Sequence, residues 1–187
     1  MSLAPLNSLL FSASALWAES LHLPVQLVRA VIRQESAGNV TAWRVEPAFR
    51  YFWNCALNAP FRAPTAEELA AKTAPADFSK PDGLAVSLHT EWWGQQASWG
   101  PMQIMGAVAR SYGFDRNFPA LCDASEGVHW GALHLSHLAA RYQAHVGWEG
   151  VAAAYNAGSP RRDSTTGVWV NQSYVDGIRR LGGLEGL

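Results

Sequence analysis

The sequence lacks the features that mark several common classes of protein. Its 187 residues include only two cysteines, too few for a disulfide scaffold or a four-thiolate zinc site. Neither sign of charge dominates: 14 basic and 15 acidic residues give a formal net charge of −1, so the chain has no basic footprint typical of nucleic-acid binding. No apolar run is long enough to span a bilayer, and alternating strand patterns are nearly absent. We therefore expect one mainly α-helical domain over residues 1–187.

Tryptophan is the residue type in excess. Nine Trp residues, with seven Phe and five Tyr, bring the aromatic fraction to 11%. One interpretation is a core built from large side chains. The other is that several Trp residues line a sugar-binding cleft, because the apolar faces of pyranose rings pack on aromatic rings and the indole N–H donates a hydrogen bond.

The N-terminal segment has an apolar run from 9 to 18 that could be mistaken for the core of a signal peptide. No basic residue precedes it, since the first one is Arg29. We expect instead a first helix and no recognisable secretion signal. The apolar stripe of this helix would consist of Leu9, Leu10, Ala13, Leu16 and Trp17.

The segment from 58 to 96 differs in composition from the rest of the chain. Its first part contains Pro60, Pro64, Pro75 and Pro81, which disfavour long regular elements. One short helix is expected after Thr65, where the sequence Thr-Ala-Glu-Glu fits a capping box. We interpret 58–96 as a surface insertion within the single domain.

Glu35 is the strongest candidate for a catalytic residue. It follows Val28, Val31 and Ile32 at spacings that keep one face of a predicted helix. Desolvation and the negative end of the helix dipole both disfavour a charged carboxylate there, so a raised pKa is expected. A carboxyl group that keeps its proton near neutral pH suits a general acid. The alternative is a helix-end Glu that points into solvent or pairs with an arginine.

Three further segments combine polar side chains with tight turns. Residues 97–105 contain Gly100 and Gln103, and Pro101 is expected to open a helix with Met102, Met105, Val108 and Ala109 inward. Residues 153–158 place Tyr155 and Asn156 at the end of an apolar helix, and Tyr174 lies on an amphipathic helix. Taken singly, these segments could be a loop, a helix cap and a core residue.

In this order, the four segments resemble the soluble lytic transglycosylases of the lysozyme-like superfamily, relatives of goose-type lysozyme. The motifs are Gln34-Glu35-Ser36, Gly100-x-Met102-Gln103-x-Met105, Ala154-Tyr155-Asn156-Ala157-Gly158 and Tyr174-Val175. The resemblance implies a lysozyme-like fold that cleaves the β-1,4 bond between N-acetylmuramic acid and N-acetylglucosamine in peptidoglycan with a 1,6-anhydro product.

The resemblance also implies a role for each matching residue. Glu35 would be the general acid and base, and Tyr174 would orient it. The segment with Ser98, Gly100, Met102 and Gln103 would line the cleft, and Tyr155 and Asn156 would contact the sugars. No cofactor or metal is implied. The partner would be the glycan strand of the cell wall. The protein would act on it as a monomer, either in the periplasm or after delivery by a phage particle.

Three departures from the family pattern affect the expected details of the cleft. Trp99 precedes Gly100 where a small residue is common, Pro101 replaces the usual Leu, and an insertion separates Glu35 from the Gly-x-Met-Gln segment. The chemistry expected at Glu35 is unaffected by them. The runner-up function is a hydrolase of the same bond, which, acting by inversion, would use a second carboxylate to activate water. Glu91 and Glu46 are the candidates for that carboxylate.

Other readings of the sequence remain open. A non-catalytic glycan-binding module would use the same motifs without turnover. His134 and His137 share one predicted helix face, as metal ligands do, but no third ligand follows at a convincing spacing, and a solvated or structural role is favoured. Cys55 and Cys122 could pair, which the sequence alone leaves open.

Overall fold

A computed structural model of the protein describes residues 6–71 and 73–187. The fold is mainly helical, as expected, and it also contains five short strands among the described residues. In chain order the elements are α1 (Ser8–Ser20), α2 (Val25–Ser36), β1 (Trp43–Val45), β2 (Trp53–Asn54), β3 (Ala59–Pro60), α3 (Ala66–Ala70), α4 (Leu88–Gln95), β4 (Ala97–Trp99), β5 (Ile104–Met105), α5 (Gly106–Ser111), the 3-10 helix η1 (Phe118–Cys122), α6 (Ala124–Ala157) and α7 (Gln172–Arg180).

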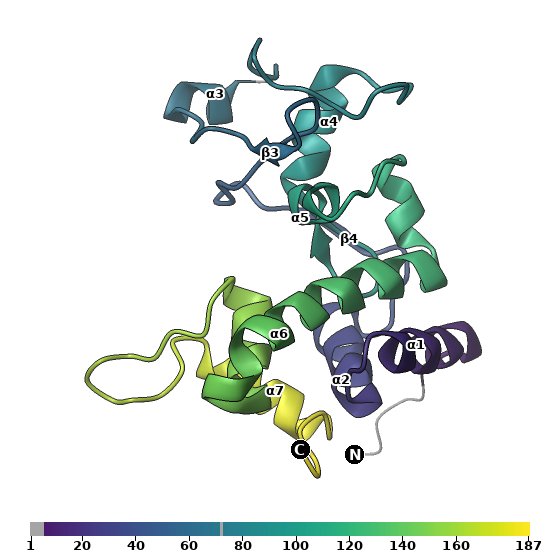
Figure 1. The fold of residues 1–187 in the computed structure, drawn as a ribbon, viewed down its shortest axis with the longest axis vertical. Helices are drawn as coiled ribbons and strands as arrows, with labels where there is room; N and C mark the ends of the chain where they lie inside the picture. The colour runs from purple at the N-terminus through teal and green to yellow at the C-terminus, as the bar shows by residue number, and fades with distance from the viewer. Residues whose placement is uncertain (1–5, 72) are drawn as a thin grey trace.

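Four helices, α1, α2, α6 and α7, form the lower lobe of the molecule in Figure 1. The long helix α6 packs against both α1 and α7, and it breaks at Gly147, where the backbone leaves helical geometry. The largest apolar core lies between these helices and includes Leu27, Ile32, Val128 and Leu135. Among the described residues, none of the helices is long and apolar enough to cross a membrane.

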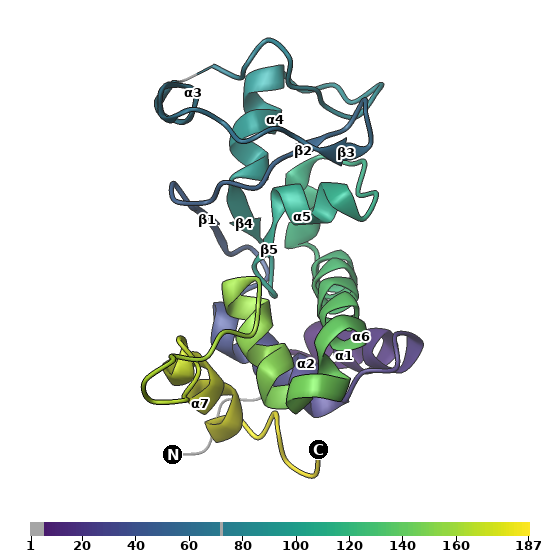
Figure 2. The ribbon, with the colours of Figure 1, turned by 60° about the vertical axis from the view of Figure 1, so that its left-hand side comes forward.

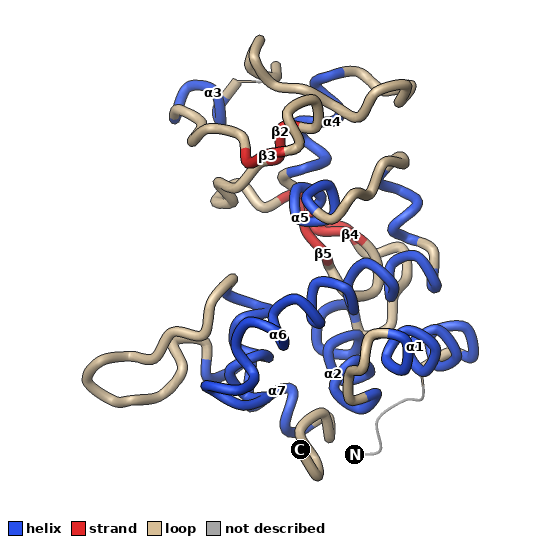
Figure 3. The backbone as a smooth tube through the Cα atoms, in the orientation of Figure 1, coloured by secondary structure: helices blue, strands red, loops and turns tan. Residues whose placement is uncertain are grey.

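The upper lobe contains α3, α4, β2 and β3, and loops make up most of its length (Figure 3). It has a small aromatic core of its own, formed by Phe52, Phe61, Phe78 and Trp92. The capping box predicted at Thr65 is present at the start of α3, where the Thr65 side chain accepts from the Glu68 backbone N–H. The segment predicted as an insertion therefore folds around buried aromatic rings rather than lying loose on the surface.

A three-stranded antiparallel sheet lies between the lobes, with β1 at one edge in the order β1-β4-β5 (Figure 2). Trp43 pairs with Trp99, Arg44 with Ser98, and Val45 with Ala97. Because side chains alternate along a strand, the two Trp residues share one face of the sheet, and Arg44 and Ser98 share the other.

Two helix predictions are wrong in detail. The helix at residues 8–20 exists, but Leu9 and Leu16 are exposed and the buried residues are Leu10, Ala13, Ser14 and Ala18. No helix opens at Pro101: residues 101–103 form a turn in which Gln103 has φ of 51°, and Ile104–Met105 pair with β4. The helix begins only at Gly106, because strand pairing uses the preceding residues.

Candidate active site

Glu35 lies in the last turn of α2, one residue before the helix ends. The predicted apolar face of this helix is buried, with Leu27, Val28, Val31 and Ile32 all inaccessible to solvent. Glu35 itself is half-buried, and Ala37, in the left-handed conformation, turns the chain away from the helix. A helix with a fully buried apolar face therefore holds the carboxyl group at the edge of the core.

Tyr174, on α7, is the direct partner of Glu35. Its hydroxyl donates a hydrogen bond to Glu35 Oε1 at 2.6 Å, and its ring is buried. Helix α7 approaches α2 closely at Gly177, where an added Cβ would lie 2.3 Å from Gln34 Oε1. The hydrogen bond from Tyr174 thus holds one oxygen of the Glu35 carboxyl group. Among the described residues, the other oxygen has no hydrogen-bond partner.

The surroundings of Glu35 favour its protonated form. Burial is the largest influence and raises the pKa of the carboxyl group above its ordinary value. The Tyr174 hydrogen bond and the charge of Arg44 lower this pKa, and the charge of Glu46 raises it, with a net upward shift. An upward shift of the pKa is the direction that favours a general acid.

Arg44 and Glu46 bring a charged pair near Glu35. Arg44 lies in β1 and Glu46 directly follows that strand, and the Arg44 Nε donates to Glu46 Oε1 at 2.6 Å. The backbone N–H of Glu46 also donates to the Gln96 carbonyl, which continues the pairing of β1 with β4. Sequence reasoning missed Arg44; the alternation Trp-Arg-Val-Glu at 43–46 was the available signal, although it is too short to be distinctive.

The side chains of the Gly-x-Met-Gln segment hold the loop together. Ser98 Oγ donates to Gln103 Oε1 at 2.9 Å, and Gln103 Nε2 donates to the carbonyls of Ala42 and Gly100. Met102 is fully buried. Gly100 has φ of 72°, and a Cβ there would lie 1.9 Å from the Leu121 carbonyl oxygen, so its lack of a side chain allows close packing.

Two hydrogen bonds connect this loop to the helices beside it. Ser36, next to Glu35, donates from Oγ to the Pro101 carbonyl at 2.8 Å, and Tyr155 donates from its hydroxyl to the Met102 carbonyl at 2.8 Å. Burial and the nearby charge of Glu35 both raise the pKa of the Tyr155 hydroxyl, which keeps its proton for this bond. The motifs predicted to surround the acid are thus brought together around the end of α2.

Asn156 is the exposed member of the predicted set. Its Oδ1 accepts a hydrogen bond from Asn171 Nδ2 at 2.9 Å, and the same amide donates to the Ala153 carbonyl. Asn171, which sequence reasoning did not single out, precedes α7 and therefore links Asn156 to the helix that carries Tyr174.

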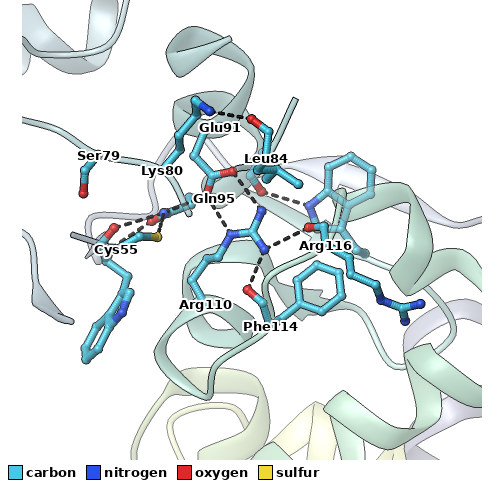
Figure 4. A network of polar contacts seen from close by, with 12 residues as sticks. Cys55, Ser79, Lys80, Leu84, Glu91, Gln95, Arg110, Phe114 and Arg116 are labelled. Atoms are coloured by element: carbon cyan, nitrogen blue, oxygen red, sulfur yellow. Dashed lines mark hydrogen bonds and ion pairs between the residues drawn. The ribbon is translucent and has the colours of Figure 1, made fainter. Parts of the chain in front are cut away.

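Glu91 does not share the surroundings of Glu35. Its carboxylate is enclosed and forms a two-point ion pair with Arg110, with both N–O distances at 2.8 Å (Figure 4). Gln95 donates to the same carboxylate, and Arg110 also donates to the carbonyls of Phe114 and Arg116. This network connects α4, α5 and the loop after α5, and such contacts indicate a structural role for the Glu91 carboxylate.

The histidine and cysteine alternatives also have defined places. His134 Nδ1 and the Tyr112 hydroxyl are 2.9 Å apart, and His137 stacks on the same tyrosine ring. Burial lowers the pKa of His134 to about 4. Within residues 6–71 and 73–187, no group of three His, Cys, Asp or Glu side chains is placed to hold a metal ion. Cys55 and Cys122 are both free thiols, so the two residues do not pair.

Comparison with known protein families matches residues 70–173 to the Transglycosylase SLT domain. Comparison with curated proteins and with solved structures gave no match. The matched range contains Ser98 to Gln103, Tyr155 and Asn156, whereas Glu35 and Tyr174 lie outside it and join these residues through the contacts described above. Because the match covers more than half of the chain, the protein belongs to the SLT transglycosylase family, whose lysozyme-like domain acts on peptidoglycan.

Proposed function

We propose that the protein is a lytic transglycosylase that uses Glu35 as its only catalytic carboxyl group. The observation that carries this proposal is the half-buried Glu35 with one oxygen held by Tyr174 and a raised pKa. The bond attacked would be the β-1,4 bond between N-acetylmuramic acid and N-acetylglucosamine. Ser98, Gly100, Met102 and Gln103 would shape the cleft mainly through their backbone, and Asn156 would offer the exposed polar contact to sugar.

The reaction needs two proton transfers at the same carboxyl group. Protonated Glu35 first donates its proton to the glycosidic oxygen, and the bond between this oxygen and C1 of muramic acid breaks with oxocarbenium character. The carboxylate left behind then accepts the proton of the C6 hydroxyl of the same sugar as that oxygen bonds to C1. Glu35 ends protonated, no water is consumed, and the product carries a 1,6-anhydro ring.

Mass spectrometry of digested peptidoglycan tests this proposal. A transglycosylase releases fragments whose muramic acid ends are lighter by one water than the reducing ends that a hydrolase leaves. We expect anhydro ends from the wild-type protein. Reducing ends alone would replace the proposal with hydrolysis, and no fragments under conditions where the protein is folded would favour a non-catalytic glycan-binding module.

Hydrolysis of the same bond is the second candidate, and the position of Glu46 favours it. Glu46 is partly exposed and lies near enough to Glu35 for its charge to raise the Glu35 pKa. A carboxylate so placed could accept a proton from an attacking water molecule. Its ion pair with the exposed Arg44 supports a charge-balancing role instead, and the enclosure of Glu91 with Arg110 argues against Glu91 as the carboxylate for this step.

The proposed setting follows from the substrate. Peptidoglycan lies outside the cytoplasmic membrane, so the protein would act in the periplasm or on delivery with a phage particle. We also propose that it works as a monomer and as a single catalytic domain over residues 1–187, because Glu35, Tyr174 and the loop at 98–103 all come from one chain.

A further inference from the structure

A pocket of about 600 Å³ lies between the sheet, helix α4 and the start of η1. Trp43, Val45, Ala97 and Trp99 line it from the sheet, which places it on the face opposite Arg44 and Ser98. Glu35 is not among the residues that line the pocket. The pocket is therefore separate from the proposed acid, and its volume falls within the range of about 300–1,000 Å³ typical of ligand sites.

Tryptophan rings form the walls of this pocket. Trp43 is 60% exposed and stacks on Trp99 with ring centroids 5.8 Å apart, and Trp99 stacks in turn on Phe118. The indole N–H of Trp99 donates to the Gly94 carbonyl, which fixes this ring. In the part of the chain that the structure describes, no hydrogen bond uses the indole N–H of Trp43 or of the partly exposed Trp93. Two exposed tryptophan residues whose indole N–H groups donate to no described residue thus border one space.

The lining of the pocket favours an uncharged ligand. Glu91 and Arg110 line its floor, but each is enclosed and neutralises the other. Among residues 6–71 and 73–187, no exposed arginine or lysine lines the pocket, so a carboxylate would find no cationic partner among them. His89, Thr90 and Asn117 supply polar groups. A flat apolar face surrounded by hydroxyl and amide groups, which is the chemistry of an N-acetylated pyranose, fits this lining better than an acidic peptide.

The position of β1 connects the pocket with the proposed active site. β1 is an edge strand, and its Trp43 lies on the face of the pocket. Its Arg44 lies on the opposite face with Ser98, whose hydroxyl donates to Gln103 in the loop that Ser36, the neighbour of Glu35, also contacts. We propose that this tryptophan pocket, formed by Trp43, Trp93 and Trp99, binds a sugar ring of a β-1,4-linked glycan strand that passes over the edge of β1. The inference rests on the proposed function, since it gives the same glycan strand a second point of contact.

Titration with a β-1,4-linked tetrasaccharide of N-acetylglucosamine tests this inference. The protein would be ¹⁵N-labelled and carry Glu35→Gln, which prevents turnover, and the indole N–H signals of Trp43 and Trp93 would be assigned by replacing each with Phe. We expect both signals to shift in a saturable manner. Trp43→Ala should weaken the binding that is monitored at Trp93 about tenfold.

Leu16→Ala is the matched control, because Leu16 is also an exposed apolar residue but lies on α1, outside the pocket. It should leave the titration unchanged. Trp43→Ala should keep the thermal melting temperature of its parent, since the ring is mostly exposed. Unchanged indole signals at saturating sugar would overturn the inference, as would signals that respond to an acidic tetrapeptide and not to the tetrasaccharide.

The titration and the proposed function fail in different ways. If the wild-type protein cleaves peptidoglycan but the indole signals do not shift, only the proposed second glycan contact is refuted. If the indole signals shift but the wild-type protein releases no fragments, the transglycosylase proposal is refuted and the sugar-binding pocket is supported.

Discussion

Glu35 and Tyr174 are 139 residues apart in the sequence and share the hydrogen bond that defines the proposed active site. Two effects act on the carboxyl group in opposite directions. Burial raises its pKa, and the hydroxyl of Tyr174 lowers it by stabilising the anion. The first effect prevails, so the structure holds an acid that stays protonated above the pH at which an ordinary glutamate loses its proton.

Replacing Tyr174 with Phe separates these effects. Loss of one neutral hydrogen bond, worth about 0.5–1.5 kcal/mol, should lower kcat roughly 2- to 12-fold. The same change removes an influence that lowers the Glu35 pKa, so the alkaline limb of the pH profile should move to higher pH. The measurement is muropeptide release as a function of pH. A lower rate with an unmoved alkaline limb would mean that Tyr174 does not act through Glu35.

Glu46→Gln distinguishes charge balance from water activation. Removing a nearby negative charge should lower the Glu35 pKa and move the alkaline limb to lower pH. With Glu35 as the only catalytic carboxyl group, the rate at acidic pH should stay within a few-fold of wild type. A loss of roughly 10²-fold or more at every pH would instead identify Glu46 as a catalytic base. Glu19→Gln, on the exposed side of α1, is the control for removing a carboxylate elsewhere.

At the scale of elements, the Glu91–Arg110 pair joins α4 of the upper lobe to α5 (Figure 4). Removing one member of a buried pair leaves the other charge without compensation, which costs about 3–5 kcal/mol. Glu91→Gln should therefore lower the free energy of unfolding by about this amount, measured by denaturant titration, and leave the kcat of the folded fraction near that of wild type.

Glu149→Gln provides the comparison, because its ion pair with Arg179 is exposed and should contribute only about 0–1 kcal/mol. Equal losses of stability for the two variants would contradict the structural role of Glu91. A fully stable Glu91→Gln variant that has lost turnover would return Glu91 to the list of catalytic candidates.

Several elements could be predicted from the sequence because their signals are local. The apolar face of α2 and the capping box of α3 depend on neighbouring residues only. The helix expected from Pro101 is wrong because pairing with β4, a tertiary contact, takes residues 104–105. Leu9 and Leu16 fit a helical apolar stripe, yet the packing of α1 against α2 and α6 buries Leu10 and Ala13 instead.

At the scale of the whole molecule, the proposed site depends on three distant segments that meet at the end of α2. The motifs at 35–36, 98–103 and 174 could be named from the sequence, and their order carried the resemblance. The structural roles of Ser98 and Gln103 could not be predicted, because their side chains also donate to the backbone carbonyls of Arg44 and Ala42, which are 54 and 61 residues away in the sequence. The ion pair of Glu91 was equally hidden, since Arg110 lies 19 residues further along the chain.

The most direct test of the account is the rate of muropeptide release by Glu35→Gln. Gln is nearly isosteric and can still accept the Tyr174 hydrogen bond, but it cannot donate and recover a proton as the acid does. We predict a rate at least roughly 10²–10⁴-fold below wild type, with an unchanged circular dichroism spectrum and with Glu19→Gln at the wild-type rate. A folded Glu35→Gln variant that releases fragments within a few-fold of the wild-type rate would contradict the assignment of Glu35 as the catalytic acid.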